Sequence, residues 1–159
     1  MHERLCEIIA GESVALRPNA YTAALSAEIL FRMTLYLRVH RLPGWVLGQM
    51  SGFLIGDELY MPHVAFIGGD LPPDRLGSHP TPPALAVEVD FPATTTSRQW
   101  INIKLETYQA VGTQVWVVTP QARKIEDHVP GEPVHIASDI LTGGPALPGF
   151  TLTLADLFL

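Results

Sequence analysis

Two carboxylates end an apolar stretch of this chain, and a lysine follows them in the next amphipathic stretch. Glu88 and Asp90 stand two residues apart in segment 84–90, which has the composition of a buried strand, so both side chains project from one face. Such a pair can hold Mg²⁺ or Mn²⁺, which would polarise a phosphoryl oxygen and activate a water molecule. Lys104, in a predicted helix over 97–110, would orient that water or neutralise the negative charge that develops.

Two interpretations of these residues remain open. In the first, they form the site of a metal-dependent phosphodiesterase. In the second, Glu88 and Lys104 form a structural ion pair, and Asp90 caps a turn before Phe91-Pro92. Structural ion pairs resemble functional sites, and the spacing of the residues does not separate the two cases.

The segments around these residues alternate between strand and helix patterns. The apolar periodicity predicts two helices, one of them ending at Gly112. Short runs rich in Val, Ile and Leu between turn residues predict strands. The predicted helices cover 20–40 and 97–110, with a helical turn at 155–159; the strands are two within 5–16 joined at Ala10-Gly11, then 45–49, 53–55, 61–67, 84–90, 114–118, 124–129 and 134–137.

The order of these elements predicts the fold class. The strand–helix–strand unit from 84 to 118 requires a parallel strand pair. Strands 45–49 and 53–55 are expected to form a hairpin across Ser51-Gly52, and 68–83 is expected to be a long loop. We therefore expect a single α/β (α+β) domain over 1–159, built on a mixed sheet flanked by helices.

Composition restricts the partners of the protein. Of 159 residues, 47% are hydrophobic and only 16% are charged, so we expect apolar surface to be covered in a homodimer. The net charge of −6 provides no overall attraction to DNA or to anionic lipid, although a local basic groove could suffice. The single cysteine, the charged N-terminus and the lack of a long apolar run favour a cytoplasmic protein that does not bind membranes.

An ordered set of short motifs runs from about residue 5 to the C-terminus. The motifs are Cys6 to Glu12, Arg17-Pro18, Gly52-Phe53, Pro62 to Phe66, Val87-Glu88-Val89, Lys104, Tyr108, Gly112, Trp116-Val117-Val118, Pro120 and Leu147 to Phe150. This set resembles the Uma-type restriction endonuclease family, which is placed in the PD-(D/E)XK nuclease superfamily. No single motif decides the resemblance, but the ordered set is specific.

The resemblance implies a fold and an activity. It implies a restriction-endonuclease-like mixed sheet and a DNA endonuclease in which Glu7, Glu88 and Lys104 are catalytic. Mg²⁺ or Mn²⁺ would lie between the acids, at a site that includes position 63.

Several positions depart from the family pattern. His63 stands where the family has a metal-binding aspartate, and imidazole suits zinc, copper or nickel better than magnesium. Trp100 replaces an aspartate one helical turn before Lys104, and Ala10 and Thr119 also replace aspartates. These changes fit relaxed selection on catalysis. The alternative function is therefore a catalytically inactive member that acts as a binding or dimerisation module.

Asp90 offers a replacement for the missing acid. It lies one same-face step beyond Glu88, and Lys104 can fill the lysine role. The expected metal ligands are then Glu88, Asp90 and His63.

Overall fold

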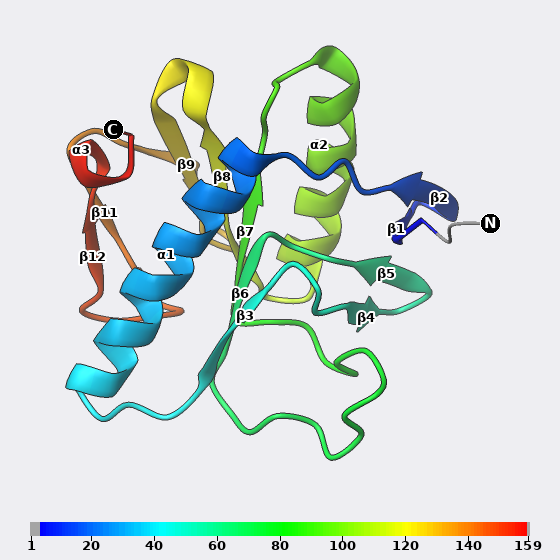
Figure 1. Cartoon of the computed structure of the whole chain (residues 1–159), viewed down its shortest axis with the longest axis horizontal. Coiled ribbons are helices and arrows are strands. Elements are labelled where there is room, and N and C mark those ends of the chain that lie inside the picture. Colours follow the sequence, from blue (N-terminus) through cyan, green and yellow to red (C-terminus); the bar gives the residue numbers. More distant parts are fainter. Residues whose placement is uncertain (1–3, 159) are drawn as a thin grey trace.

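A six-stranded mixed sheet forms the centre of the computed structural model, which describes residues 4–158 (Figure 1). Its strands, in spatial order, are β10 (His135–Ala137), β9 (Lys124–His128), β8 (Gln114–Thr119), β7 (Leu85–Val89), β6 (Val64–Ile67) and β3 (Trp45–Gly48). Strands β7 and β8 are parallel, and the other neighbours are antiparallel. The predicted parallel pair is confirmed.

Two smaller sheets complete the fold. One has the order β2 (Glu12–Ala15), β1 (Cys6–Ile9), β5 (Glu58–Tyr60) and β4 (Phe53–Ile55), and the other pairs β11 (Ile140–Thr142) with β12 (Thr151–Thr153). The predicted turn between β1 and β2 is confirmed, because Ala10 and Gly11 have φ values of 52° and 76°. Gly11 supplies at no steric cost the left-handed conformation that this tight turn needs.

The predicted hairpin between β3 and β4 is wrong. Strand β3 pairs with β6, and β4 pairs with β5 across the turn at Gly56-Asp57. Ser51-Gly52 is turn-like in composition but connects strands of two different sheets. Strand β4 also receives a parallel bridge from His79, whose N–H donates to Gly52 O at 2.7 Å.

Three helices flank the sheets: α1 (Ala20–Val39), α2 (Thr95–Ala110) and α3 (Leu154–Leu157). Helix α1 begins where the Asn19 side chain accepts a hydrogen bond from the N–H of Thr22. Helix α2 begins with a reciprocal capping box between Thr94 and Ser97. No helix in the described part of the chain is long and apolar enough to cross a bilayer.

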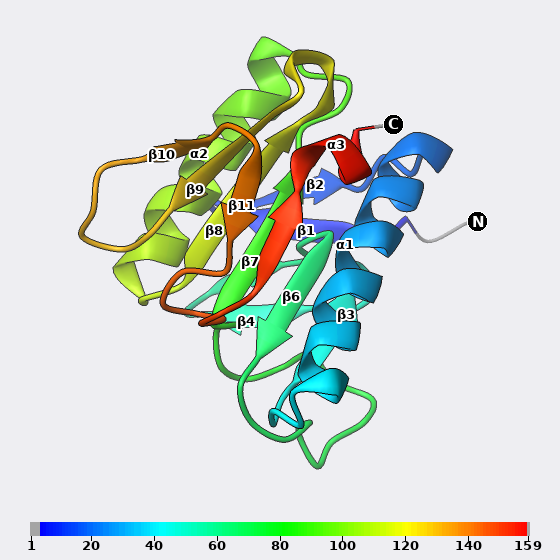
Figure 2. The same cartoon turned by 90° about the vertical axis from the view of Figure 1, so that its left-hand side faces the viewer.

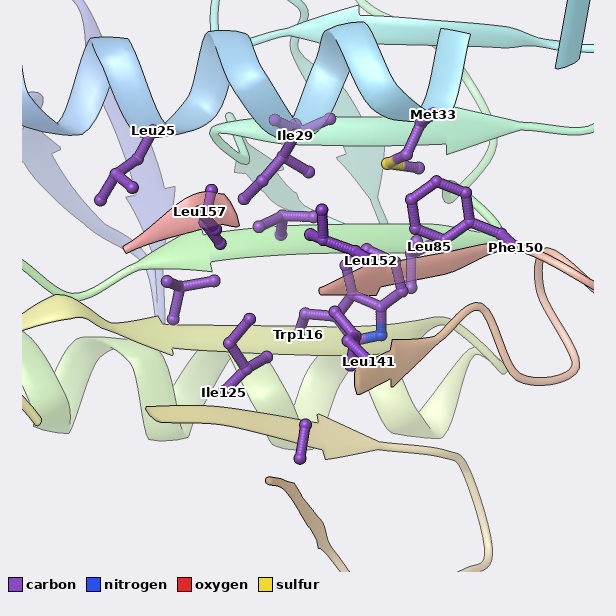
Figure 3. Packing of buried hydrophobic residues seen from close by; sticks show 14 of the residues in the cluster. Leu25, Ile29, Met33, Leu85, Trp116, Ile125, Leu141, Phe150, Leu152 and Leu157 are labelled. Carbon is purple, nitrogen blue, oxygen red and sulfur yellow. The ribbon is translucent and has the colours of Figure 1, made fainter. Parts of the chain in front are cut away.

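The helices cover opposite faces of the central sheet (Figures 1 and 2). Leu85, Val87 and Val89 of β7 pack toward α1, α3, β11 and β12, in the cluster that Figure 3 shows around Trp116. Ala86 of β7 packs on the other side, with α2 and the four-stranded sheet. Because side chains alternate along a strand, Glu88 also lies on the α2 side.

The expected fold class is confirmed: a mixed sheet flanked by helices. Strand β7 lies inside the six-stranded sheet, and all five of its residues are buried. Its C-terminal end, with α2 on one side and the four-stranded sheet beside it, is where the candidate site residues gather.

Candidate functional site

Lys104 joins Glu7 to Glu88. Its Nζ lies 2.6 Å from Glu7 Oε1 and 2.5 Å from Glu88 Oε1. The three side chains come from β1, β7 and α2, and all three residues are buried. The predicted catalytic residues, which are 97 positions apart at most, therefore meet at one point.

Backbone and aromatic groups hold this triad in place. The N–H of Met61 donates to Glu7 Oε1 at 2.7 Å, and the Tyr108 hydroxyl donates to Glu88 Oε1 at 3.4 Å. Lys104 Nζ also lies 5.4 Å from the centre of the Tyr60 ring, which packs edge-on against Tyr108. One oxygen of each carboxylate is thus fixed, and the ammonium has a defined position between them.

Burial and charge act in opposite directions on these groups. Burial favours the neutral form of Glu7 and raises its pKa despite the nearby Lys104 charge. Burial also disfavours the charge on Glu88, but the Lys104 ammonium outweighs it and lowers the pKa of Glu88. Burial disfavours the Lys104 ammonium as well, but Glu88 and Glu7 outweigh it and raise its pKa. At neutral pH, Lys104 and Glu88 are both charged.

His63 lies at the start of β6, beside Glu88. Its Nδ1 accepts a hydrogen bond from the N–H of Val89 at 3.1 Å and lies 3.5 Å from Glu88 Oε2. A nitrogen that accepts from a backbone N–H has no free lone pair for a metal ion. In this arrangement the neutral ring carries its proton on Nε2.

Asp90 is buried at the beginning of α2. Its Oδ1 accepts a hydrogen bond from Ser97 Oγ at 2.7 Å, and its N–H donates to Val118 O at 2.8 Å. A carboxylate in this place also interacts favourably with the positive end of the helix dipole. Part of its role is therefore to fix the first turn of α2 against β7.

These residues line one cleft of about 860 Å³. Its floor is polar and contains Glu7, Glu88 and Lys104, with Asp90 and His63 beside them. The remaining basic side chain among the lining residues is that of Arg17, which is exposed. Apolar walls of the cleft include Trp100 and Phe91, both half-buried.

The donor set can be compared with the needs of a divalent metal. Among the described residues, no hydrogen bond reaches Oε2 of Glu7 or Oε2 of Glu88. Mg²⁺ commonly uses one or two carboxylates, retained waters and substrate phosphate, so two free carboxylate oxygens fit it. Within residues 4–158, however, no three His, Cys, Asp or Glu side chains are grouped closely enough to hold a metal. The predicted set of His63, Glu88 and Asp90 thus stays a prediction.

Sequence reasoning missed two contributors to this site. Tyr60 lies behind Lys104, and the N–H of Met61 fixes Glu7. Tyr60 ends β5 and Met61 follows it, so both contacts arise because β5 pairs with β1. Strand β5 was not predicted. A three-residue strand with one buried residue carries too little periodicity to be recognised.

A family model described as "Putative restriction endonuclease", Uma2, matches residues 2–155. The chain belongs to the Uma2 family. This confirms the family resemblance on the basis of nearly the whole chain.

A solved structure shows the same fold as this Uma2 protein. It is described as a "putative nuclease belonging to DUF820" from Anabaena variabilis. The TM-score is 0.82 at 16% sequence identity, over 99% of this chain and 91% of the other. None of the curated proteins matches the sequence.

Proposed function

We propose that this Uma2 protein is a divalent-metal-dependent endonuclease that hydrolyses phosphodiester bonds in DNA. The observation that carries the proposal is the convergence of Glu7, Glu88 and Lys104 at the floor of an open cleft. The family description and the nuclease-like fold support it. Mg²⁺ or Mn²⁺, when bound, would supply a polarised phosphoryl oxygen and an activated water.

The residues of the chain have distinct roles in this proposal. Glu7 and Glu88 hold the metal through the carboxylate oxygens that Lys104 does not engage. Lys104 stabilises the negative charge that develops on the phosphoryl group. Asp90 completes the metal site on one side, and His63, whose Nδ1 accepts from the N–H of Val89, lies beside Glu88 without offering that nitrogen to the metal.

A cleavage assay tests the proposal. Purified protein is incubated with plasmid and with single-stranded DNA in Mg²⁺, in Mn²⁺ and in chelator. Metal-dependent cleavage is expected in the wild type, with a loss of at least a hundredfold in Glu88→Gln. The control is Asp127→Asn, which alters a buried acid on β9 that bonds Gln114 and lies outside the cleft. Cleavage that survives in Glu88→Gln would contradict the proposal.

A second candidate function is a catalytically inactive binding or dimerisation module. The observation that favours it is that Lys104 already pairs with both acids, while His63 has its Nδ1 engaged by Val89. In that case the triad is a buried structural ion pair. No metal would then bind in the cleft, and Glu88→Gln would change stability without changing any activity.

We also propose that the protein is a cytoplasmic homodimer in which residues 1–159 form one domain. Large apolar side chains stay exposed along α1, including those of Phe31, Leu35 and Val39, and Trp45 of the edge strand β3 is exposed too. Cys6 is a free thiol, which suits a reducing compartment. Light scattering coupled to size exclusion, with Phe31→Glu beside the wild type, measures the oligomeric state. A monomeric wild type would contradict the dimer.

A further inference from the structure

The cleft is poorly equipped for double-stranded DNA. A protein that binds a duplex along its backbone neutralises several phosphates with lysine and arginine side chains. Two basic side chains line this cleft: Lys104, which is paired with two acids at the floor and reaches only a phosphate placed there, and Arg17, which is exposed. Arg98, the arginine of α2, is already engaged, because it makes two hydrogen bonds to Glu126 at 2.7 and 2.9 Å.

The wall of the cleft instead offers aromatic and apolar surface. Trp100 lies on α2 four residues before Lys104, so both face the cleft about 6 Å apart along the helix axis. Lys104 is at the buried floor, and Trp100 is half-buried and nearer to solvent. Phe91 lines the cleft as well, and its ring lies 4.7 Å from that of Tyr21.

Trp100 is not needed to fill the core. It packs at the edge of the cluster formed by α2 and the four-stranded sheet, whereas Ile101, Leu105 and Tyr108 of the same helix are buried in it. The partly exposed indole on the wall of this cleft is available to a ligand that enters it. A nucleobase has an apolar face of suitable size for this surface.

We propose that the cleft takes an unpaired stretch of DNA, with one base stacked on the indole of Trp100 and the adjoining phosphate toward Lys104. This inference rests on the proposed function and names the substrate class of the same site. Stacking on aromatic side chains binds single strands with few cations, since every base has a face to stack. A base inside a duplex is already stacked on its neighbours and cannot reach the indole.

Binding in the absence of cleavage tests the inference. The anisotropy of a labelled oligothymidylate is measured in Ca²⁺ and compared with a hairpin duplex of equal length. The single strand is expected to bind at least tenfold more tightly. Trp100→Leu is expected to weaken single-strand binding about tenfold or more, and Trp100→Phe less, because a smaller ring still stacks.

The matched control is Trp45→Leu. Trp45 is also a partly exposed tryptophan, with 49% of its surface accessible, but it lies on the edge strand β3 outside the cleft lining. Its variant is expected to bind within twofold of the wild type. In Trp45→Phe, the remaining fluorescence comes from Trp100 and from the fully buried Trp116, so quenching by the oligonucleotide reports on Trp100 without altering it.

Three results would overturn the inference: equal or tighter binding of the duplex, unchanged binding by folded Trp100→Leu, or no quenching in Trp45→Phe. Failure of the proposed function is a separate result. Metal-dependent cleavage of duplex and single strand at equal rates would leave the nuclease proposal intact and remove the single-strand preference. Single-strand binding without any metal-dependent cleavage would support the single-strand preference and contradict the nuclease proposal.

Discussion

The N–H of Val89 donates a hydrogen bond to Nδ1 of His63. Val89 lies on β7, the strand that also carries Glu88. The backbone of β7 thereby orients the imidazole at the position where the Uma-type pattern has an aspartate. The ring is held beside Glu88, but the nitrogen nearest to that carboxylate is already engaged. This residue therefore adds no negative charge to the site and no free Nδ1 lone pair.

Replacing His63 by an acid should strengthen metal binding. His63→Asp adds a carboxylate beside Glu88, and the affinity of a site for Mg²⁺ or Mn²⁺ rises with ligand charge. We expect Mn²⁺ to bind on the order of tenfold more tightly by calorimetry. His63→Asn, which matches aspartate in shape but lacks its charge, is the control and should show no gain. An equal gain in both variants would refute the electrostatic explanation.

The two buried tyrosines behind Lys104 should respond differently to loss of their hydroxyl groups. The hydroxyl of Tyr108 bonds Glu88, so Tyr108→Phe should lower the free energy of unfolding by about 1 kcal/mol. The nearby Thr107 hydroxyl donates to Ile103 O, and no hydrogen bond to the Tyr60 hydroxyl forms among the described residues. Tyr60→Phe should thus be neutral or stabilising. Urea unfolding compares the two; a larger loss in Tyr60→Phe would contradict the geometry.

Removing Lys104 should be more harmful than removing one of its partners. Lys104→Met leaves Glu7 and Glu88 buried and close together without a counterion, a change that costs about 3–5 kcal/mol. Adding Glu7→Gln to this variant relieves the repulsion and should restore part of the loss. Urea unfolding of the single and double variants measures their free energies of unfolding. A double variant less stable than Lys104→Met would contradict this account.

Arg98 and Glu126 hold the first half of α2 against β9, and their contribution should depend on pH. The Arg98 hydrogen bonds lower the pKa of Glu126, although the carboxylate is buried. A depressed pKa in the folded state gives stability above the unfolded pKa of 4.5, which is lost as pH falls through the folded pKa.

Glu126→Gln should therefore lower the free energy of unfolding by about 1 kcal/mol at pH 6, since the pair is partly exposed. The difference from the wild type should shrink toward pH 3. His128, whose pKa burial lowers, lies 3.5 Å from Glu126, so His128→Gln is run in parallel. A difference that grows on acidification would contradict the sign.

Long periodic elements were predictable from the sequence, but only some of the short strands were: β4 and β10 were predicted, whereas β5, β11 and β12 were not. Helices α1 and α2 and strand β7 have repeated apolar positions that fix their type and facing. Strands β5, β11 and β12 have three residues each, and β3 pairs with β6 over an intervening segment that local turn chemistry does not reveal. Register between distant strands is set by the packing of the whole chain.

Some features of the candidate site were likewise predictable from the sequence, and others were not. The side of β7 that carries Glu88 follows from alternation, and the position of Lys104 follows from the helix period. The engagement of Lys104 with both acids, and of His63 with the Val89 N–H, depends on where β1 and β6 lie relative to β7. Periodicity contains no such information, so the phosphodiesterase and ion-pair interpretations could not be separated from the sequence.

The central claim is that the two carboxylates of the cleft still hold a metal although Lys104 lies between them. Thermal unfolding with and without saturating Mn²⁺ tests it most directly, beside Glu88→Ala and the Asp127→Asn control. A ligand of the native state stabilises it by about 2.7 kcal/mol at a hundred times its dissociation constant. We predict a metal-dependent rise in melting temperature in the wild type and in Asp127→Asn that is absent in Glu88→Ala. No rise in the wild type, or an equal rise in Glu88→Ala, would contradict the claim.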